Sequence, residues 1–470
     1  MNKIRRQTGF ATDKTTPRRA LKAILFAVAV LLAASALWPP KAPAAAFYVD
    51  PVAGNDEADG SASKPWRTIA KAQSIGKAED VINLAPADYG HLAFSARTKA
   101  GEEGKHIIWR SDPSKSGAAR FSKVSFSGAK NSYTTLEGLE IENTDDTACI
   151  AIENSSHVTI TGCAARGRPG GVGPSYANIV IKISNDVLIH NCEVYYSGRD
   201  ACGVQMENCD RITVRDCHVH DIVSSGIRAH GGGNYVIEYN VVHDQRADWN
   251  PEVHGSGISI RSHDTAIRGN VIYNYGNTRP IRFYQDWAGR DGYRNMLVEN
   301  NLVYKTPDFT GTQWWPEFID LGDNCVLRNN TFIGDVVIII ASAADGSGLS
   351  LHNNVFTGTL QVEQPHKWPR IRHGRNLFGK LAARGCGWMC FHSDFTPAGG
   401  NMTAASFPVG GFFASGPARY PYSAEHPYTL SPKSPAAGFA DPNEAPPADL
   451  LMRKRGNPAD AGCLQLSNQE

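Results

Sequence analysis

Ionisable side chains recur at one position of five successive short segments in the middle of the chain. That position is held by Lys182, Glu207, His230, Arg261 and Tyr284. Near neutral pH a histidine can remove a proton, a neighbouring carboxylate can orient it, and an arginine can bind a negatively charged group. We therefore predict acid–base chemistry with His230 as the base, Glu207 orienting it and Arg261 holding the substrate. Lys182 and Tyr284 are the alternative base or the acid.

A second polar position in this part of the chain lies two residues before the first one. It is held by Gln205, Arg228, Ser259, Arg282 and Asp320. Because a guanidinium group pairs bidentately with carboxylates, Arg228 and Arg282 are expected to bind acidic groups of a substrate, with Gln205 beside them. The alternative is that both positions belong to a charged, solvated outer face with no chemistry.

Long loops adjoin these segments. They are residues 245–254, 285–295 and 305–317. The first loop ends at His254, and the third carries Trp314 and Trp315, on whose faces sugar rings can stack beside polar groups. We predict that these three residues bind substrate. A packed loop core is the alternative for the two tryptophans.

The elements that must position these residues form a repeat. Short strands with alternating apolar residues end in a cysteine or an asparagine, and the copies are 22 to 31 residues apart. The residues at this repeat position are Cys163, Cys192, Cys217, Asn240, Asn270, Asn301, Asn330, Asn354 and Asn376. Each unit of such a repeat must bury its apolar face against its neighbours. The period fits three short strands per turn, so we predict an all-β parallel β-helix with these residues stacked in an internal column.

Alternation along the strands decides which residues face the core. The residues predicted to face inward are Val204, Met206, Ile227, Ala229, Ile258, Ile260, Ile281, Phe283, Ile319 and Leu321. The two polar positions then face outward as two columns. Since stacked strands lie about 4.8 Å apart, Glu207, His230 and Arg261 should be neighbours.

Both ends of the repeat array carry further features. Residues 47–50 (FYVD) predict a strand, residues 65–72 (PWRTIAKA) predict a short helix that covers the first coil, and LSP at 430–432 and DAG at 460–462 follow the array. With the repeat, these ends resemble the right-handed parallel β-helix proteins of the pectate lyase superfamily, from residue 47 to about residue 463. The resemblance implies a single-stranded right-handed parallel β-helix with a short N-terminal cap helix.

The superfamily includes pectate lyases, alginate lyases and C5-epimerases. In these enzymes a base removes the proton beside a uronate carboxylate, whose charge arginine, lysine or calcium neutralises, and lyases then expel the leaving group. The resemblance thus implies an enzyme that acts on an acidic polysaccharide, and we expect β-elimination by a monomer. The columns lack the adjacent acidic pair of a glycosidase. A C5-epimerase, a glycoside hydrolase and a non-catalytic glycan-binding surface protein stay open as alternatives.

Metal sites are not predicted from the sequence. There is no paired Cys-x-x-Cys or Cys/His set for zinc and no D-x-D-x-D-G loop for calcium. The predicted site therefore holds no assigned metal. Calcium stays open as a cofactor through oxygen atoms of Asp248, Glu252 and Asp320.

Two groups can be distinguished among the ten cysteines. Cys163, Cys192 and Cys217 hold the repeat position and are expected to pack as small apolar groups. Cys386 and Cys390 are the better disulfide candidates, with each other or with Cys463.

Histidine and aspartate recur together at 220–221 and 243–244, each after a strand of the repeat. Tyr195, Tyr273 and Tyr304 fill the histidine position in neighbouring coils. We predict an aromatic brace at a corner of the coils in preference to a catalytic pair, because a histidine most often has a structural partner.

The first 46 residues predict an export signal. Arg18-Arg19 precedes an apolar run at 23–38 and a small-residue stretch, APAAA, at 42–46. The paired arginines resemble a twin-arginine signal, while an ordinary secretory signal and an uncleaved anchor are alternatives. We expect a periplasmic or secreted protein with no stable membrane span after cleavage. The remaining chain divides into a β-helix at 47–400 and an irregular C-terminal segment at 401–470 that packs on it. A formal net charge of +1 gives no reason to expect a nucleic-acid partner.

Overall fold

The protein is described by a computed structural model. It covers residues 44–246, 250, 252, 255–275, 279–284, 289, 291–311, 315–384, 391–394, 400–403, 412–421 and 426–466. Residues 46–470 form one compact unit, and the predicted export signal lies almost entirely outside the described residues. In the described part of the chain, no helix is long and apolar enough to cross a bilayer.

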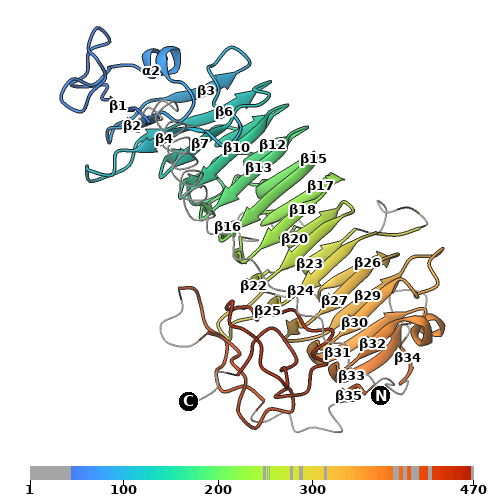
Figure 1. Ribbon diagram of the computed structural model, residues 1–470. Helices are drawn as coiled ribbons and strands as arrows, with labels where there is room; N and C mark the ends of the chain where they lie inside the picture. Colours follow the sequence, from blue (N-terminus) through green and yellow to red (C-terminus); the bar gives the residue numbers. More distant parts are fainter. Residues whose placement is uncertain are drawn as a thin grey trace, which may run out of the picture. The chain divides into compact units, whose positions relative to one another are not determined.

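The compact unit is a parallel β-solenoid, as the sequence predicts (Figure 1). Each coil contributes one short strand to each of three parallel sheets, and each strand pairs with its counterparts in the coils before and after it. Strands β15, β31 and β33 continue round a corner and belong to two sheets. The predicted fold class is confirmed.

The first sheet carries the two predicted columns. Its strands are β3 (His91–Ser95), β6 (Lys123–Ser127), β9 (Ile150–Glu153), β12 (Ala177–Lys182), the first half of β15 (Cys202–Arg215), β17 (Ile227–Gly233), β20 (Ser256–Arg261), β23 (Arg279–Phe283), β26 (Glu317–Leu321), β29 (Val336–Ile340) and the ends of β31 (Val355–Glu363) and β33 (Leu377–Arg384).

The second sheet follows the first in each coil. Its strands are β1 (Ala46–Val49), β2 (Val81–Leu84), β4 (Ile107–Ser111), β7 (Thr134–Glu137), β10 (Ser156–Thr161), β13 (Asn185–His190), the second half of β15, β18 (Tyr235–Glu238), β21 (Thr265–Arg268), β24 (Met296–Glu299), β27 (Cys325–Arg328), β30 (Leu349–His352) and β32 (Arg372–Gly374).

The third sheet completes each coil. Its strands are β5 (Arg120–Phe121), β8 (Glu140–Glu142), β11 (Ala164–Arg166), β14 (Glu193–Tyr195), β16 (His218–Ile222), β19 (Val241–Gln245), β22 (Val271–Tyr273), β25 (Leu302–Tyr304), β28 (Thr331–Phe332), the starts of β31 and β33, and β35 (Met402–Thr403). A short strand, β34 (Phe391–Asp394), pairs antiparallel with β33, and a 3-10 helix, η1 (Pro365–Arg370), follows β31.

The N-terminal helix predicted at 65–72 is observed as α2 (Ile69–Ile75), slightly further along the chain. It begins after Thr68, whose side chain accepts a hydrogen bond from the Lys71 backbone N–H at 3.1 Å and so caps the helix. The helix buries Ala72 in the main core.

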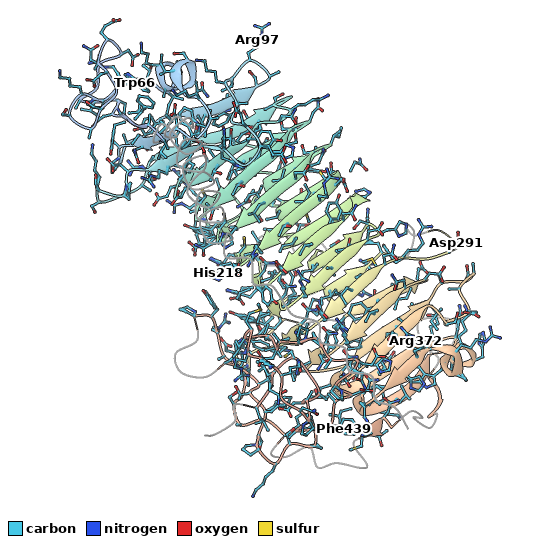
Figure 2. All side chains as sticks on the ribbon, in the orientation of Figure 1. Trp66, Arg97, His218, Asp291, Arg372 and Phe439 are labelled. Atoms are coloured by element: carbon cyan, nitrogen blue, oxygen red, sulfur yellow. The ribbon has the colours of Figure 1, made fainter. Side chains whose placement is uncertain are left out.

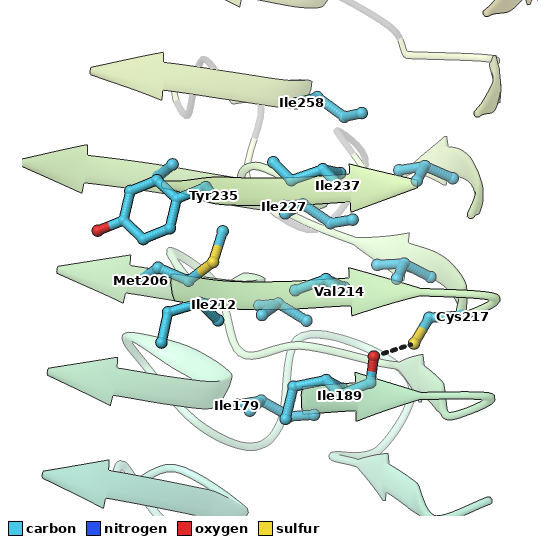
Figure 3. Close-up of a cluster of buried hydrophobic side chains, with 14 of the residues drawn as sticks. Ile179, Ile189, Met206, Ile212, Val214, Cys217, Ile227, Tyr235, Ile237 and Ile258 are labelled. Carbon is cyan, nitrogen blue, oxygen red and sulfur yellow. Dashed lines mark hydrogen bonds between the residues drawn. The ribbon is translucent and has the colours of Figure 1, made fainter. Parts of the chain in front are cut away.

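The interior is a continuous apolar core that runs through the coils. Figure 3 shows part of it, where Ile179, Met206, Ile227 and Ile258 come from successive strands of the first sheet. All four side chains are fully buried. Because each coil covers its neighbours in this way, the apolar face of one strand is removed from water only when the next coil stacks on it.

The asparagines of the repeat form a buried hydrogen-bonded ladder at the turn between the second and third sheets. Each amide Nδ2 donates to Oδ1 of the asparagine in the next coil at 2.9 to 3.0 Å, from Asn240 to Asn376. The ladder has one more rung than predicted, because Asn376 donates to Asn401.

The cysteines at the same turn are buried free thiols, as predicted for Cys163, Cys192 and Cys217. The thiol of Cys217 lies 3.7 Å from the Ile189 carbonyl oxygen of the preceding coil (Figure 3). Cys386 and Cys390 lie outside the described residues. Cys463 is a buried free thiol, so the alternative in which it pairs with one of them is not observed, while a pairing of Cys386 with Cys390 stays a prediction.

One predicted alignment is also wrong, in β26. Phe318 and Leu321 belong to the main core, whereas Ile319 packs in a separate cluster with Val337 and Ile339. The register shifts between Phe318 and Leu321, and Asp320 has a φ of 54°, so the strand bulges here. Simple alternation therefore fails at this strand.

The described C-terminal residues, 412–421 and 426–466, pack on the side of the coils. Arg455 donates to Asn300 Oδ1 at 2.7 Å, and the Cys463 backbone N–H donates to Thr331 Oγ1 at 3.0 Å. The Tyr304 hydroxyl donates to the Ala418 carbonyl oxygen. The domain boundaries predicted at residues 46 and 400 stay predictions.

Candidate functional site

The strand register places the residues of the first predicted column next to one another on successive strands. Lys182 pairs with Glu207, Glu207 with His230, and His230 with Arg261. Tyr284 follows the end of β23 and is the last member of the column, since its ring centroid lies 3.8 Å from Cζ of Arg261. All five side chains are partly exposed on the outer face of the first sheet.

Two glycines follow His230 within β17. Gly231 and Gly232 have φ values of 64° and 68°, and a Cβ on Gly232 would lie 2.0 Å from the Cys209 carbonyl oxygen. Only glycine fits this close approach, so the two glycines let β17 continue past His230 in register with Cys209 and Asp210 of β15.

Glu207 has several partners, and His230 is not among them. Gln205 donates to Glu207 Oε1 at 2.6 Å, the Tyr176 hydroxyl donates to the same oxygen, and Lys182 Nζ lies 3.3 Å from Oε2. The pKa of Glu207 is raised because burial disfavours its charged form, and Arg228 opposes this effect. The predicted role of Glu207 in orienting His230 is thus not supported by a hydrogen bond.

His230 lies in a cationic environment. Burial lowers the pKa of its imidazole below 6.5, and the charges of Arg261 and Arg228 lower it further. Within the part of the chain that the structure describes, the imidazole has no hydrogen-bond or ion-pair partner. A neutral histidine with a free nitrogen can accept a proton near neutral pH.

The arginines around His230 differ in how they are held. Arg228 donates to the hydroxyls of Ser224 and Ser225 at 3.2 and 3.3 Å. Arg261 stacks on Tyr284, and its buried Nε has no hydrogen-bond partner. Among the described residues, no carboxylate lies within ion-pair distance of Arg228 or Arg261.

The second column differs from the prediction at its last member. Gln205 pairs with Arg228, Arg228 with Ser259 and Ser259 with Arg282, as predicted. Arg282 then pairs with Glu317, and not with Asp320, because of the bulge in β26. Glu317 is buried and lies 2.5 Å from Arg279 Nε and 3.8 Å from Arg282 Nε.

Of the predicted substrate-binding residues in the long loops, the structure describes only Trp315. His254 and Trp314 lie outside the described residues, as does Asp248 of the calcium hypothesis. Trp315 is partly buried against Ile319, Val337 and Ile339, which fits the alternative of a packed loop core.

The aromatic brace predicted at a corner of the coils is confirmed as a stack of rings, but the rings lie on the third sheet itself. Tyr195, His220, His243, Tyr273 and Tyr304 follow one another with centroids 4.6 to 5.3 Å apart and interplanar angles of 8° to 14°. Each histidine also bonds to the next residue: His220 Nδ1 lies 2.7 Å from Asp221 and His243 Nδ1 2.9 Å from Asp244.

Several contributing residues were missed by sequence reasoning. Tyr176 precedes β12 and so lay outside the aligned segments, and Glu317 was missed because the bulge hides its register. Glu193 and His218 pair with each other on the third sheet, in an outward column beside the stack of aromatic rings. The His-x-His pattern at 218–220 was the available signal for this cluster.

The chain matches a family model described as "Right handed beta helix region" over residues 122–278 and 202–362. These matches together span half of the chain, so the protein belongs to this right-handed β-helix family. Residues 52–94 also match a family described as a protein of unknown function, DUF1565. No curated protein sequence matches the chain.

Solved structures share the fold. Pectate lyase Pel9A is 14% identical, with a TM-score of 0.56, and the match covers 91% of this chain and 97% of that one. XylC in its complex with xylose is 10% identical, with a TM-score of 0.51 and coverage of 90% and 98%. The chain therefore has a pectate-lyase-like β-helix fold, and at these identities the likeness extends to the fold alone.

Proposed function

We propose that the protein is an enzyme that cleaves an acidic, uronate-containing polysaccharide by β-elimination. One observation carries the proposal: Arg228 lies two residues before His230 on β17, Arg261 pairs with His230 from β20, and neither arginine has a carboxylate partner among the described residues. Guanidinium groups without an internal counter-ion favour an anionic ligand. A carboxylate suits them well, because its two oxygen atoms can accept two parallel hydrogen bonds from one guanidinium group.

The chemistry follows from this arrangement. With the uronate carboxylate bound by Arg228 and Arg261, its negative charge no longer opposes loss of the adjacent C5 proton. Neutral His230 takes that proton, and the C5–H electron pair forms the new C4–C5 double bond. The C4–O bond breaks, and the leaving oxygen receives a proton from Tyr284 or Lys182.

The test is a panel of acidic polysaccharides incubated with purified protein. Ultraviolet absorbance from new unsaturated ends, together with reducing ends, supports a lyase. Reducing ends without absorbance mean hydrolysis and overturn β-elimination. If neither appears, the lyase proposal fails, and proton exchange at C5 followed by NMR then separates an epimerase from a glycan-binding protein.

The same assay tests the base. His230→Ala should lower turnover by about 100- to 10,000-fold, the usual contribution of a general base. His157→Ala is the matched control, because His157 also faces outward and lies 3.9 Å from Asp186, but on the second sheet. Full activity in His230→Ala would remove His230 as the base.

For its location, we propose that the protein is exported, on the support of the arginine pair and apolar run in residues 18–38. An extracytoplasmic location fits a polymeric substrate that cannot enter the cytoplasm.

A further inference from the structure

A second cluster of ionisable side chains lies on the third sheet, away from the two columns. Glu193 of β14 pairs in register with His218 of β16, and His220 is the next outward residue of the same strand. The side chain of Glu193 is about half exposed, whereas those of His218 and His220 are 22% and 14% exposed. Figure 2 shows His218 at the side of the coil stack, midway along it.

The hydrogen-bond partner of His220 defines which nitrogen carries a hydrogen. Its Nδ1 lies 2.7 Å from Oδ2 of Asp221, and an ionised carboxylate only accepts hydrogen bonds. In the neutral imidazole, Nδ1 therefore carries the hydrogen and Nε2 has the lone pair. That Nε2 lies 3.3 Å from Glu193 Oε1, which is a second acceptor.

A chain of three residues fixes His218 in the same way. Asp244 Oδ2 lies 2.9 Å from Nδ1 of His243, so His243 Nε2 is an acceptor. It lies 2.7 Å from Nε2 of His218, which must donate. The lone pair of His218 is thereby left on Nδ1, which lies 3.6 Å from the same Glu193 oxygen.

With both imidazoles neutral, three electron-pair donors converge without a hydrogen between them. In the absence of a metal ion, the carboxylates of Asp221 and Glu193 outweigh burial and raise the pKa of His220 to about 9, so a proton competes with a metal ion for the same position. One oxygen or nitrogen from each of Glu193, His218 and His220 lies within 4.8 Å of the other two. Acceptors that face one another repel unless a positive charge lies between them. We propose that these three residues bind a divalent transition-metal ion, for which Zn2+ is the best fit.

The distances and ligand types agree with zinc. Imidazole nitrogen and carboxylate oxygen bind zinc at about 2.0 to 2.2 Å, which puts tetrahedral ligands about 3.3 Å apart. The two measured separations from Glu193 Oε1 are 3.3 and 3.6 Å. Two histidines and one glutamate leave a fourth position for water or another oxygen ligand.

The surroundings supply the outer contacts that metal-binding histidines have. Such histidines donate their second N–H to a carboxylate or another acceptor, which fixes the ring and raises its basicity. Asp221 does this for His220 and His243 does it for His218. Arg246 lies 3.0 Å from Asp221 and Arg419 lies 2.6 Å from Asp244, which keeps both carboxylates ionised and oriented.

The experiment is a Zn2+ titration by calorimetry of tag-free protein that has been stripped with a chelator. We expect one tight site per chain, a melting temperature that rises with added Zn2+, and absorption bands of tetrahedral coordination when Co2+ replaces it. Glu193→Gln and His220→Gln should abolish the tight site. Asp221→Asn should weaken it by about 10- to 100-fold.

His190→Gln is the matched control, because His190 also lies beside a carboxylate, with Nε2 3.3 Å from Asp216. It should bind Zn2+ as the wild type does. Absence of a tight site in the wild-type protein would overturn the proposal and leave protons as the positive charges between these groups. Unchanged affinity in His220→Gln would overturn it as well, and neither measurement depends on knowing the polysaccharide.

Discussion

Asn270 donates a hydrogen bond from its amide Nδ2 to Oδ1 of Asn301 in the next coil, at 3.0 Å. Both side chains are fully buried, and Asn270 Oδ1 accepts from the backbone N–H and the amide of Asn240. Every coil of the ladder therefore satisfies the polar groups of its neighbour. A buried polar column is stable only when each member is paired.

Replacement of Asn270 by lysine should destabilise the protein severely. The substitution breaks the ladder and buries an unpaired charge, which should cost about 4 kcal/mol or more in the free energy of unfolding. Chemical denaturation measures it. Asn443→Lys, at an exposed asparagine, should change stability by less than about 0.5 kcal/mol. Equal stability of the two variants would contradict the ladder.

The corrected register of β26 predicts a role for Glu317 in stability. Glu317→Ala removes the carboxylate that lies 2.5 Å from the partly buried Arg279, and loss of one partner of a buried pair costs about 3 to 5 kcal/mol. The exposed pair of Asp345 and Arg370 is the comparison, because Asp345→Ala should cost about 1 kcal/mol or less. If denaturation midpoints fall equally, the pairing of Glu317 is not as described.

The lowered pKa of His230 predicts the acid side of the pH profile. A base works when it is neutral, so kcat/KM on an active substrate should fall as pH drops through a midpoint below 6.5. Arg261→Gln removes one of the charges that lower this pKa. The midpoint should then move upward, toward 6.5, in addition to any loss of substrate binding. An unchanged midpoint would mean that another group is the base.

Glu207→Gln should reveal what burial of this carboxylate costs in stability. Burial raises the pKa of Glu207 above 4.5, so its charged form at pH 7 costs folding free energy, and stability is gained as pH falls through the raised pKa. A neutral glutamine removes this cost. We expect an equal or higher melting temperature at pH 7. A lower melting temperature would show that its contacts to Gln205 and Lys182 outweigh burial.

The arginine pair at 18–19 predicts the export route. Replacement of both arginines by lysine should retain the protein in the cytoplasm if the signal is of the twin-arginine type, because an ordinary secretory signal needs only positive charge. Cell fractionation measures this. Continued secretion of the double-lysine variant would exclude the twin-arginine route while leaving export intact.

Much of the fold could be predicted because a solenoid repeats one local rule. Asparagine or cysteine at a fixed place in each unit predicts the buried turn, and alternation of apolar residues predicts which side chains face inward. These signals act within a strand or between adjacent coils. They were enough to predict the column of Lys182, Glu207, His230 and Arg261, which the strand register confirms.

The rest depended on geometry that alternation does not encode. Because of a single bulge in β26, Glu317 and not the predicted Asp320 lies in the second column. One extra residue in a strand interrupts the alternation of inward and outward side chains.

The cluster of Glu193, His218 and His220 also combines a feature that the sequence predicts with one that only the folded chain determines. The sequence by itself determined that His220 belongs to a column of aromatic residues on successive coils. Tertiary structure decided that Glu193, 25 residues before His218, meets two histidines whose other nitrogens are already bonded. Tautomer and orientation depend on contacts between coils, and only the stacked coils bring those atoms together.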